Sequence, residues 1–200
     1  MEPNGRLLVV CTANVCRSPL AQRVLGLRLG GGVAVSSAGV RALSGSPMCA
    51  VSALELPDGA DPTHAARQVE GDDVRAADLV VAMEREQRGA LVREAPGTQA
   101  SVFTLREAAA LAGALAERGE RYPDLAAVAR AMHGQRGLVA VPADPVPPRR
   151  WWQRAVPPED PLTIVDGHGA PEPQHRAAAA RVRAVSEDLA AALGALLAPR

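Results

Sequence analysis

The beginning of the chain combines a short apolar run with an amphipathic segment. Residues 7–10 are Leu-Leu-Val-Val, a continuous run that is typical of a strand buried on both faces. Ser18 followed by Pro19 is a helix-start signal, with Ser at the N-cap and Pro at the first helical position. One buried face of that helix is predicted from four apolar residues: Leu20, Val24, Leu27 and Leu29. The unit is therefore predicted to be a strand, a seven-residue loop and a helix.

Later hydrophobic segments predict three more strands, one starting at Val33 and two over residues 78–83 and 101–105. Helices are predicted over residues 47–56 and 84–94, from Arg106 onward, and over Gln174–Leu197. Four short strands separated by helices indicate an α/β fold: a doubly wound, four-stranded parallel sheet with helices on both faces, flavodoxin-like. Right-handed crossovers would place the loop after the first strand at the carboxyl edge of the sheet, where ligands bind.

The pattern changes over about residues 119–158. A short helix is predicted over Tyr122–Met132, and residues 142–158 are rich in Pro and Arg around Trp151 and Trp152. Two hundred residues fit one domain, so we expect a single domain over 1–200 with a loop or insertion here. Packing of the two Trp side chains onto the core is favoured over an aromatic rim for a substrate ring.

Composition narrows the classes of function. The formal net charge is +0, which argues against general binding to nucleic acid or to a membrane surface. The chain contains no Lys, which excludes a Walker-type nucleotide loop and Schiff-base chemistry. No signal peptide and no long apolar span are visible, and three Cys fit a reducing compartment, so a cytoplasmic location is expected. No His/Cys/Asp cluster has ligand spacing, and Cys49 is interpreted as a small hydrophobe rather than a metal ligand.

The loop after the first strand carries the candidate chemistry. Its backbone amides can turn inward as a nest, with a helix dipole behind them, and so bind a phosphate-sized dianion. Arg17 adds a planar charged fork, and Cys11 at the floor of the loop is favoured as a thiolate nucleophile aimed at phosphorus. The Ser18 hydroxyl is placed to donate to that sulfur. The predicted substrate-binding residues are Thr12, Ala13, Asn14, Val15, Cys16, Arg17 and Ser18.

The string Cys-Thr-Ala-Asn-Val-Cys-Arg-Ser-Pro, from Cys11 to Pro19, has the Cys-x5-Arg-Ser pattern of the phosphotyrosine phosphatases. Its place near the N-terminus, with Asn14 and Cys16 inside it, resembles the low-molecular-weight branch. The resemblance extends over about residues 5–113 and 158–198. It implies hydrolysis of phosphotyrosine, on a protein or as an aryl phosphate, through a phosphocysteine on Cys11 with Arg17 as a catalytic residue. It also implies that no metal and no cofactor are needed.

The same resemblance assigns supporting residues. Ser37, in the string Ser-Ser-Ala-Gly, is expected to join the hydrogen bonds that support the loop. His64, in a string similar to the family's Ser/Thr-His-x-Ala-Arg-Gln segment, is expected to bond to Asn14. The family usually has Asp where Glu84 stands, so no role is carried over to Glu84.

A general acid is implied by the resemblance as an Asp followed by Pro, between the fourth strand and the last helix. Two residues qualify, Asp144 and Asp160. Asp160 is favoured, because Glu-Asp-Pro matches the family's own string and precedes the last helix by about a dozen residues. The family often has Tyr after this Asp-Pro, where Leu162 stands here, so aromatic clamping and phosphorylation at that position are not expected.

Three alternative functions remain open. Arsenate reduction on the same fold needs a further pair of cysteines, and beyond the loop only Cys49 remains. Arginine phosphatases carry Thr where Val15 stands, which favours phosphotyrosine. A catalytically silent phosphate-binding or redox-sensing module could trap Cys11 as a disulfide with Cys16.

Overall fold

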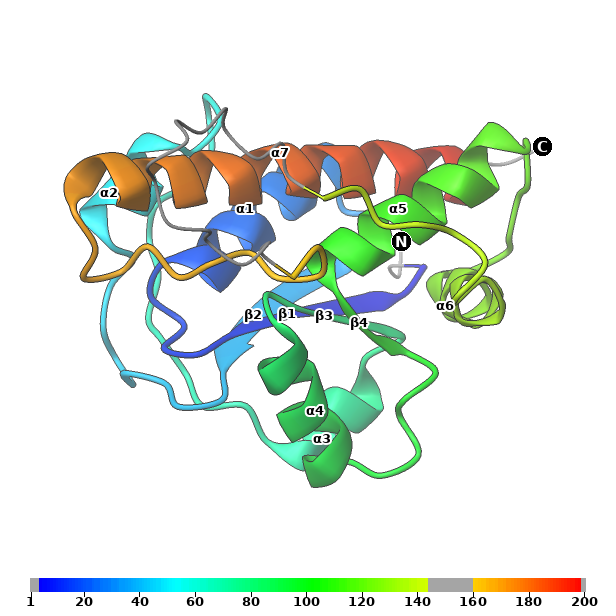
Figure 1. The fold of residues 1–200 in the computed structure, drawn as a ribbon, viewed down its shortest axis with the longest axis horizontal. Helices are drawn as coiled ribbons and strands as arrows, with labels where there is room; N and C mark the ends of the chain where they lie inside the picture. Colours follow the sequence, from blue (N-terminus) through cyan, green and yellow to red (C-terminus); the bar gives the residue numbers. More distant parts are fainter. Residues whose placement is uncertain (1–3, 144–159, 199–200) are drawn as a thin grey trace, which may run out of the picture.

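The fold is built on a parallel sheet, described in a computed structural model for residues 4–143 and 160–198 (Figure 1). Its strands are β1 (Arg6–Cys11), β2 (Ala34–Gly39), β3 (Leu79–Ala82) and β4 (Val102–Thr104), in the order β2-β1-β3-β4. All three pairings are parallel, and Cys11 lies opposite Gly39 at the end of β1. The predicted doubly wound sheet is confirmed. The loop that follows β1 therefore begins near the middle of the carboxyl edge of the sheet.

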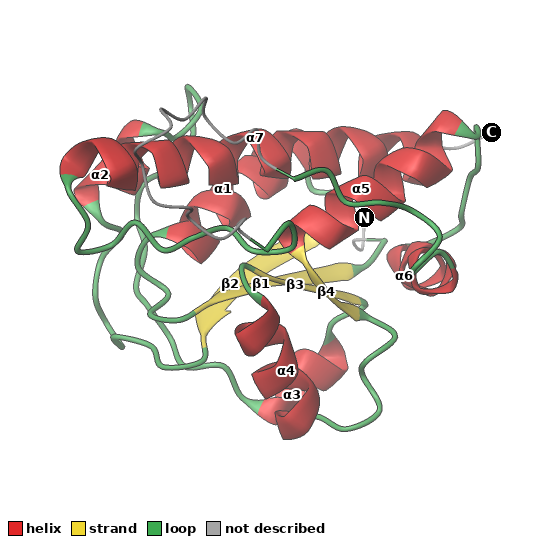
Figure 2. Cartoon of the chain, viewed as in Figure 1, coloured by secondary structure: helices red, strands yellow, loops and turns green. Residues whose placement is uncertain are grey.

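Helices cover both faces of the sheet (Figure 2). One face carries α1 (Arg17–Leu29), α5 (Leu105–Glu117) and α7 (Glu172–Leu197), with α2 (Ala50–Leu54) beside them. The other face carries α3 (Gly71–Ala76) and α4 (Arg85–Glu94). The remaining helix, α6 (Leu125–Gly134), contributes four buried residues to the core shared with α5 and α7: Leu125, Val128, Ala129 and Met132.

The side-chain alternation of β1 explains the two layers. Leu7, Val9 and Cys11 join the core that α1, α5 and α7 cover. Leu8 and Val10 join the separate core under α3 and α4. A strand with both faces buried requires an unbroken apolar run, and this is the pattern that residues 7–10 present.

Helix boundaries differ from the sequence prediction in several places. The N-cap of α1 is Cys16 and not Ser18, because the backbone is already helical at Arg17 and the Ser18 hydroxyl is used elsewhere. Leu27 is 46 % exposed, and Leu25 occupies the core instead. The second helix begins at Ala50 rather than near Pro47, and α3 was not predicted.

Part of the expected insertion lies within the described residues. Residues 119–143 contain α6, which begins three residues later than predicted. Asp144, Trp151 and Trp152 lie outside the described residues, as does Glu159. Within the described part of the chain, no helix is both long and apolar enough to cross a membrane.

Candidate active site

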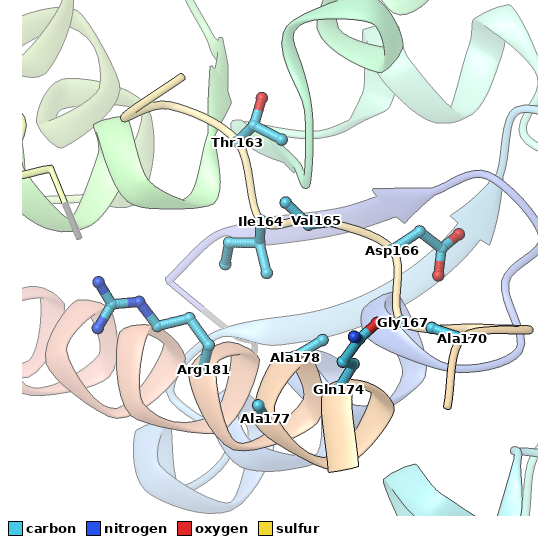
Figure 3. A pocket seen from close by; sticks show the side chains of 10 residues that line it. All are labelled: Thr163, Ile164, Val165, Asp166, Gly167, Ala170, Gln174, Ala177, Ala178 and Arg181. Carbon is cyan, nitrogen blue, oxygen red and sulfur yellow. The ribbon is translucent and has the colours of Figure 1, made fainter. Parts of the chain in front are cut away.

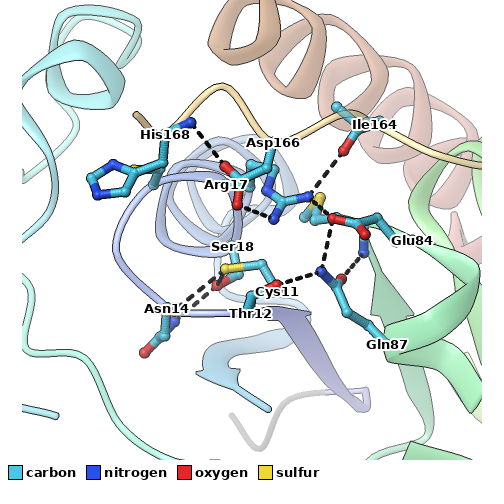
Figure 4. Close-up of polar contacts among 12 residues, drawn as sticks. Cys11, Thr12, Asn14, Arg17, Ser18, Glu84, Gln87, Ile164, Asp166 and His168 are labelled. Carbon is cyan, nitrogen blue, oxygen red and sulfur yellow. Dashed lines mark hydrogen bonds and ion pairs between the residues drawn. The ribbon is translucent and has the colours of Figure 1, made fainter. Parts of the chain in front are cut away.

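The phosphate loop, residues 11–17, surrounds the sulfur of Cys11 with hydrogen-bond donors. The backbone N–H of Asn14 donates to this sulfur at 3.3 Å, and the Ser18 hydroxyl oxygen lies 3.0 Å from it (Figure 4). The Asn14 side-chain amide donates to the same hydroxyl oxygen at 2.9 Å, which leaves the hydroxyl hydrogen able to point at the sulfur. Both contacts stabilise negative charge on Cys11. The predicted contact of Ser18 with the nucleophile is therefore present.

Asn14 fixes the shape of the loop. Its φ of 56° places it in the left-handed region, which Asn tolerates better than most residues and which helps to turn successive amides inward. The side chain is fully buried, and its amide also donates to Ser37 Oγ at 3.0 Å. Its carbonyl oxygen accepts the Arg67 N–H at 2.9 Å. His64 Nε2 lies 2.7 Å from the Asn14 backbone oxygen, so the contact expected of His64 is present.

Two neighbouring residues complete this support. The Ser37 hydroxyl donates a hydrogen bond to Gln22 Oε1 at 2.7 Å, so the network continues into α1. Gly39 allows the loop to lie against the end of β2, since a Cβ atom there would be 2.6 Å from the Thr12 carbonyl oxygen. The conformation of the loop therefore depends on contacts with three other segments of the chain: α1, β2 and residues 64–67.

Arg17 closes the loop with a buried guanidinium that is 4 % exposed. Its Nη1 donates to Glu84 and to the Ile164 carbonyl oxygen, the latter at 3.0 Å. Its Nη2 donates to Asp166 Oδ2 at 2.6 Å. Glu84, to which no role was carried over, thus holds the guanidinium in place. A planar fork fixed in this way is pre-organised for phosphate oxygens.

Gln87 ties Glu84 to the loop. Its Nε2 donates to Glu84 Oε1 and to Thr12 Oγ1, each at 3.1 Å, while its Oε1 accepts the Met83 N–H at 2.9 Å. Gln87 is 3 % exposed, so this bridge lies in the interior. No motif in the sequence indicates Gln87. Only its position on the predicted helix after the third strand places it near the carboxyl edge of the sheet.

The contacts described for Asp160, the expected general acid, are with Arg85 and within its own turn, and none is with the phosphate loop. Its carboxylate accepts Arg85 Nε at 2.6 Å and the Leu162 N–H at 3.1 Å, within a turn of its own. Partial burial raises the pKa of Asp160, but the Arg85 ion pair and hydrogen bonds outweigh it and lower the pKa overall.

Asp166, six residues further on, is the carboxylate that reaches the loop. The Ile164 N–H donates to the Met83 carbonyl oxygen at 2.9 Å, which lays this part of the chain beside the end of β3 and carries the next residues toward Arg17. The other Asp166 oxygen accepts the His168 N–H at 3.0 Å. Its side chain is 42 % exposed, which leaves it accessible to a bound substrate.

A cavity of about 340 Å³ lies behind this carboxylate, between the chain at residues 163–170 and α7 (Figure 3). Ile164, Ala178 and Arg181 are among its lining residues, while the Asp166 carboxylate extends from the segment away from α7. Asp166 is therefore positioned by its bonds to Arg17 and to the His168 N–H rather than by close packing from behind.

The second cysteine of the loop and Cys49 each contact a histidine. Cys16 Sγ lies 3.2 Å from His168 Nδ1, and Cys49 Sγ lies 3.6 Å from His175 Nε2. A hydrogen bond between the two thiol groups raises the pKa of Cys16 and lowers the pKa of Cys49 to about 5. Ligand spacing along the sequence could not indicate these Cys–His contacts, because the partners are 152 and 126 residues apart.

The model of one protein family, low molecular weight phosphotyrosine protein phosphatase, matches residues 6–115 of this chain. The match begins at β1, contains the whole phosphate loop, and ends inside α5. This chain belongs to the low molecular weight phosphotyrosine protein phosphatase family.

Individual relatives agree with this family. A probable low molecular weight protein-tyrosine-phosphatase, EpsP, from Ralstonia nicotianae is 43% identical over 104 residues, which cover 50% of this chain and 70% of the relative. A protein-arginine-phosphatase from Geobacillus stearothermophilus is 34% identical over 103 residues, 51% of this chain and 70% of the relative. The solved structure of the tyrosine phosphatase Wzb from Escherichia coli K30 with phosphate superposes with a TM-score of 0.61 at 19% identity, covering 95% of this chain and 99% of Wzb. That last likeness shows the shared fold.

Proposed function

We propose that this member of the family hydrolyses phosphotyrosine in phosphorylated proteins through a phosphocysteine on Cys11. The observation that carries the proposal is the environment of the Cys11 sulfur, which faces the Asn14 N–H and the Ser18 hydroxyl on a loop that ends in the buried Arg17. A stabilised thiolate beneath an anion cradle is the arrangement that in-line attack on a phosphomonoester requires.

The first step forms the bond between Cys11 sulfur and phosphorus and breaks the bond between phosphorus and the phenolic oxygen. Charge on the equatorial phosphate oxygens is held by the loop amides and by Arg17. The departing oxygen takes a proton, which we assign to the carboxylic acid of Asp166. Its contact with Arg17 at 2.6 Å places this carboxylate beside the phosphate-binding guanidinium, whereas the contacts described for Asp160 are with Arg85 and within its own turn.

The second step releases phosphate. A water molecule attacks phosphorus, the bond between sulfur and phosphorus breaks, and Cys11 leaves as a thiolate. Asp166, now ionised, accepts the proton of the attacking water and is restored to the acid. Neither step requires a metal ion, because Arg17 and the amides supply the positive charge. Cys11 must remain reduced throughout, which supports a reducing compartment such as the cytoplasm.

Tyrosine is favoured over arginine as the phosphorylated residue because of Val15. This side chain is 7 % exposed and packs with Cys16 and Ala66 in a small apolar cluster beside the loop. An apolar wall suits an aryl ester better than a charged guanidinium. The alternative retains support from the arginine-phosphatase relative, so the two substrates need direct comparison.

The test is turnover of a phosphotyrosine peptide and a phosphoarginine peptide of the same sequence, each with a metal chelator present. We expect a higher kcat/KM for phosphotyrosine and undiminished activity in the chelator. A preference for phosphoarginine would overturn the substrate assignment, and loss of all turnover in the chelator would overturn the mechanism. Cys11→Ser should retain phosphate binding and lose turnover.

A further inference from the structure

We infer that Cys16, Cys49, His168 and His175 form a zinc site beside the active site. Among the described residues, one ligand atom each from Cys16, His168 and His175 lies within 4.8 Å of the other two. Cys49 joins them through its sulfur, which is 3.6 Å from His175 Nε2. We call these four residues the Cys2His2 cluster.

Two of the distances between the ligand atoms match those around a tetrahedral zinc ion. With bonds of about 2.3 Å to sulfur and about 2.0–2.1 Å to nitrogen, tetrahedral angles separate a sulfur and a nitrogen ligand by about 3.5 Å. The two sulfur–nitrogen distances in the cluster are 3.2 and 3.6 Å. The His168 and His175 rings stand edge to face with 5.8 Å between their centroids, so both can present a nitrogen to one point.

The chemical types of the four ligand atoms indicate which metal ion the site would bind. Two thiolates and two neutral imidazoles suit zinc and disfavour magnesium, calcium and manganese, which prefer oxygen ligands. Each thiol would lose its proton to solvent on binding, so the site as a whole would be neutral. The Asp166 carboxylate nearby adds further attraction for a cation, since its charge acts on Cys16.

Groups around the cluster orient its ligands, as they do in structural metal sites. The Ser52 N–H donates to Cys49 Sγ at 3.4 Å, and the Ser52 hydroxyl oxygen lies 3.2 Å from the same sulfur. The His168 N–H is held by Asp166 Oδ1 at 3.0 Å. The Ser52 contacts reach the sulfur that would bind the metal, and the Asp166 contact holds the backbone of His168.

The four ligands come from four different parts of the fold. Cys16 belongs to the phosphate loop, Cys49 caps α2, and His175 lies in the first turns of α7. His168 follows Asp166 by two residues. Zinc bound here would join the phosphate loop to the segment that carries Asp166, and it would occupy the Cys16 thiol, the candidate disulfide partner of Cys11.

The test is zinc binding by the full, reduced chain after removal of metal, followed by competition with a chromogenic chelator. We expect one zinc ion per chain. Cobalt in its place should give the thiolate charge-transfer absorption and the intense visible bands of tetrahedral coordination. Because the titration measures no turnover, its result is independent of whether the proposed phosphatase activity is correct.

Four variants locate the ion. Cys49→Ala and His175→Gln each remove one ligand outside the catalytic machinery and should weaken zinc binding by more than the roughly 10–100-fold that loss of an outer partner costs. Two matched controls should bind zinc as the unchanged chain does: Cys11→Ser, which removes the nucleophile, and His133→Gln, which removes a histidine on α6. Circular dichroism would establish that each variant is folded.

Three outcomes would overturn the inference: no zinc bound by the reduced chain, binding lost in Cys11→Ser but kept in Cys49→Ala, or a cobalt spectrum without thiolate absorption. The stoichiometry and cobalt spectrum of the unchanged chain decide the matter even if one ligand variant fails to fold.

Discussion

Arg17 Nη2 lies 2.6 Å from Asp166 Oδ2, although the two residues are 149 positions apart in the sequence. The contact joins the phosphate loop, at the start of the chain, to the segment that leads into α7. It brings the anion-binding guanidinium and a carboxylate to one place, beside the buried Cys11. The residues proposed as nucleophile, phosphate anchor and proton donor therefore come from two distant parts of the sequence.

Asp166→Asn should lower kcat for phenyl phosphate and phosphotyrosine by about 10²- to 10⁴-fold, because these leaving groups need a proton. The loss should be much smaller for p-nitrophenyl phosphate, whose phenolate leaves without help. The measurement is kcat for a series of aryl phosphates in which the acidity of the phenol varies.

Asp160→Asn is the matched control, since its carboxylate is paired with Arg85 on the surface of the turn. It should change kcat only slightly and equally for all members of that series. If Asp160→Asn shows the steep dependence on leaving group and Asp166→Asn does not, the assignment of the acid is reversed.

Asn14→Ala should destabilise the fold and disable the loop together. It removes the buried amide that donates to Ser18 and Ser37 and accepts from the Arg67 N–H, leaving buried polar groups without partners. The free energy of unfolding should fall by about 2–4 kcal/mol, measured by urea denaturation. Phosphate affinity should fall as well, and an Asn14→Ala protein with unchanged stability and activity would refute the role given to this network.

Gly39→Ala should distort the loop from behind, because the added Cβ would meet the Thr12 backbone oxygen at 2.6 Å. We expect a lower melting temperature and a higher inhibition constant for phosphate, which means weaker binding. Gly26→Ala on α1 is the control, since nothing lies within 4 Å of the added carbon, and it should be neutral or raise stability by up to about 1 kcal/mol. Equal effects of the two substitutions would contradict the close approach of loop and strand.

Glu84→Ala should free the Arg17 guanidinium on one side and leave Gln87 without one acceptor. The expected result is a rise in KM and a fall in kcat/KM for aryl phosphates, with the fold retained. Glu84→Gln should recover part of the loss, because the amide oxygen can still accept from Arg17. An unchanged kcat/KM in Glu84→Ala would show that Arg17 needs no carboxylate at this position.

Much of the fold and the centre of the site followed from local patterns. The apolar run at residues 7–10, the small residues after it and the Cys-x5-Arg spacing are all contained in one short stretch, so the strand, the loop, Cys11 and Arg17 could be predicted together. Ser37 and His64 could be placed only through the family resemblance. Their contacts with Asn14 depend on how β2 and the chain near residue 64 pack against the loop.

The parts that could not be predicted depend on distant contacts. Asp166 is followed by Gly167 rather than Pro, so the Asp-Pro pattern could not indicate it. Only the pairing of Ile164 with Met83 shows which carboxylate reaches Arg17. The Cys2His2 cluster could not be predicted for the same reason, since its members have no regular spacing along the chain.

The central claim is that Cys11 carries the phosphoryl group during turnover. Its most direct test is rapid acid quenching of Asp166→Asn during hydrolysis of p-nitrophenyl phosphate, followed by mass spectrometry of the peptide that contains both Cys11 and Cys16. This variant still forms the intermediate from a good leaving group and hydrolyses it slowly, so we expect a phosphoryl group on Cys11. No covalent phosphate, or phosphate on Cys16 alone, would contradict the account.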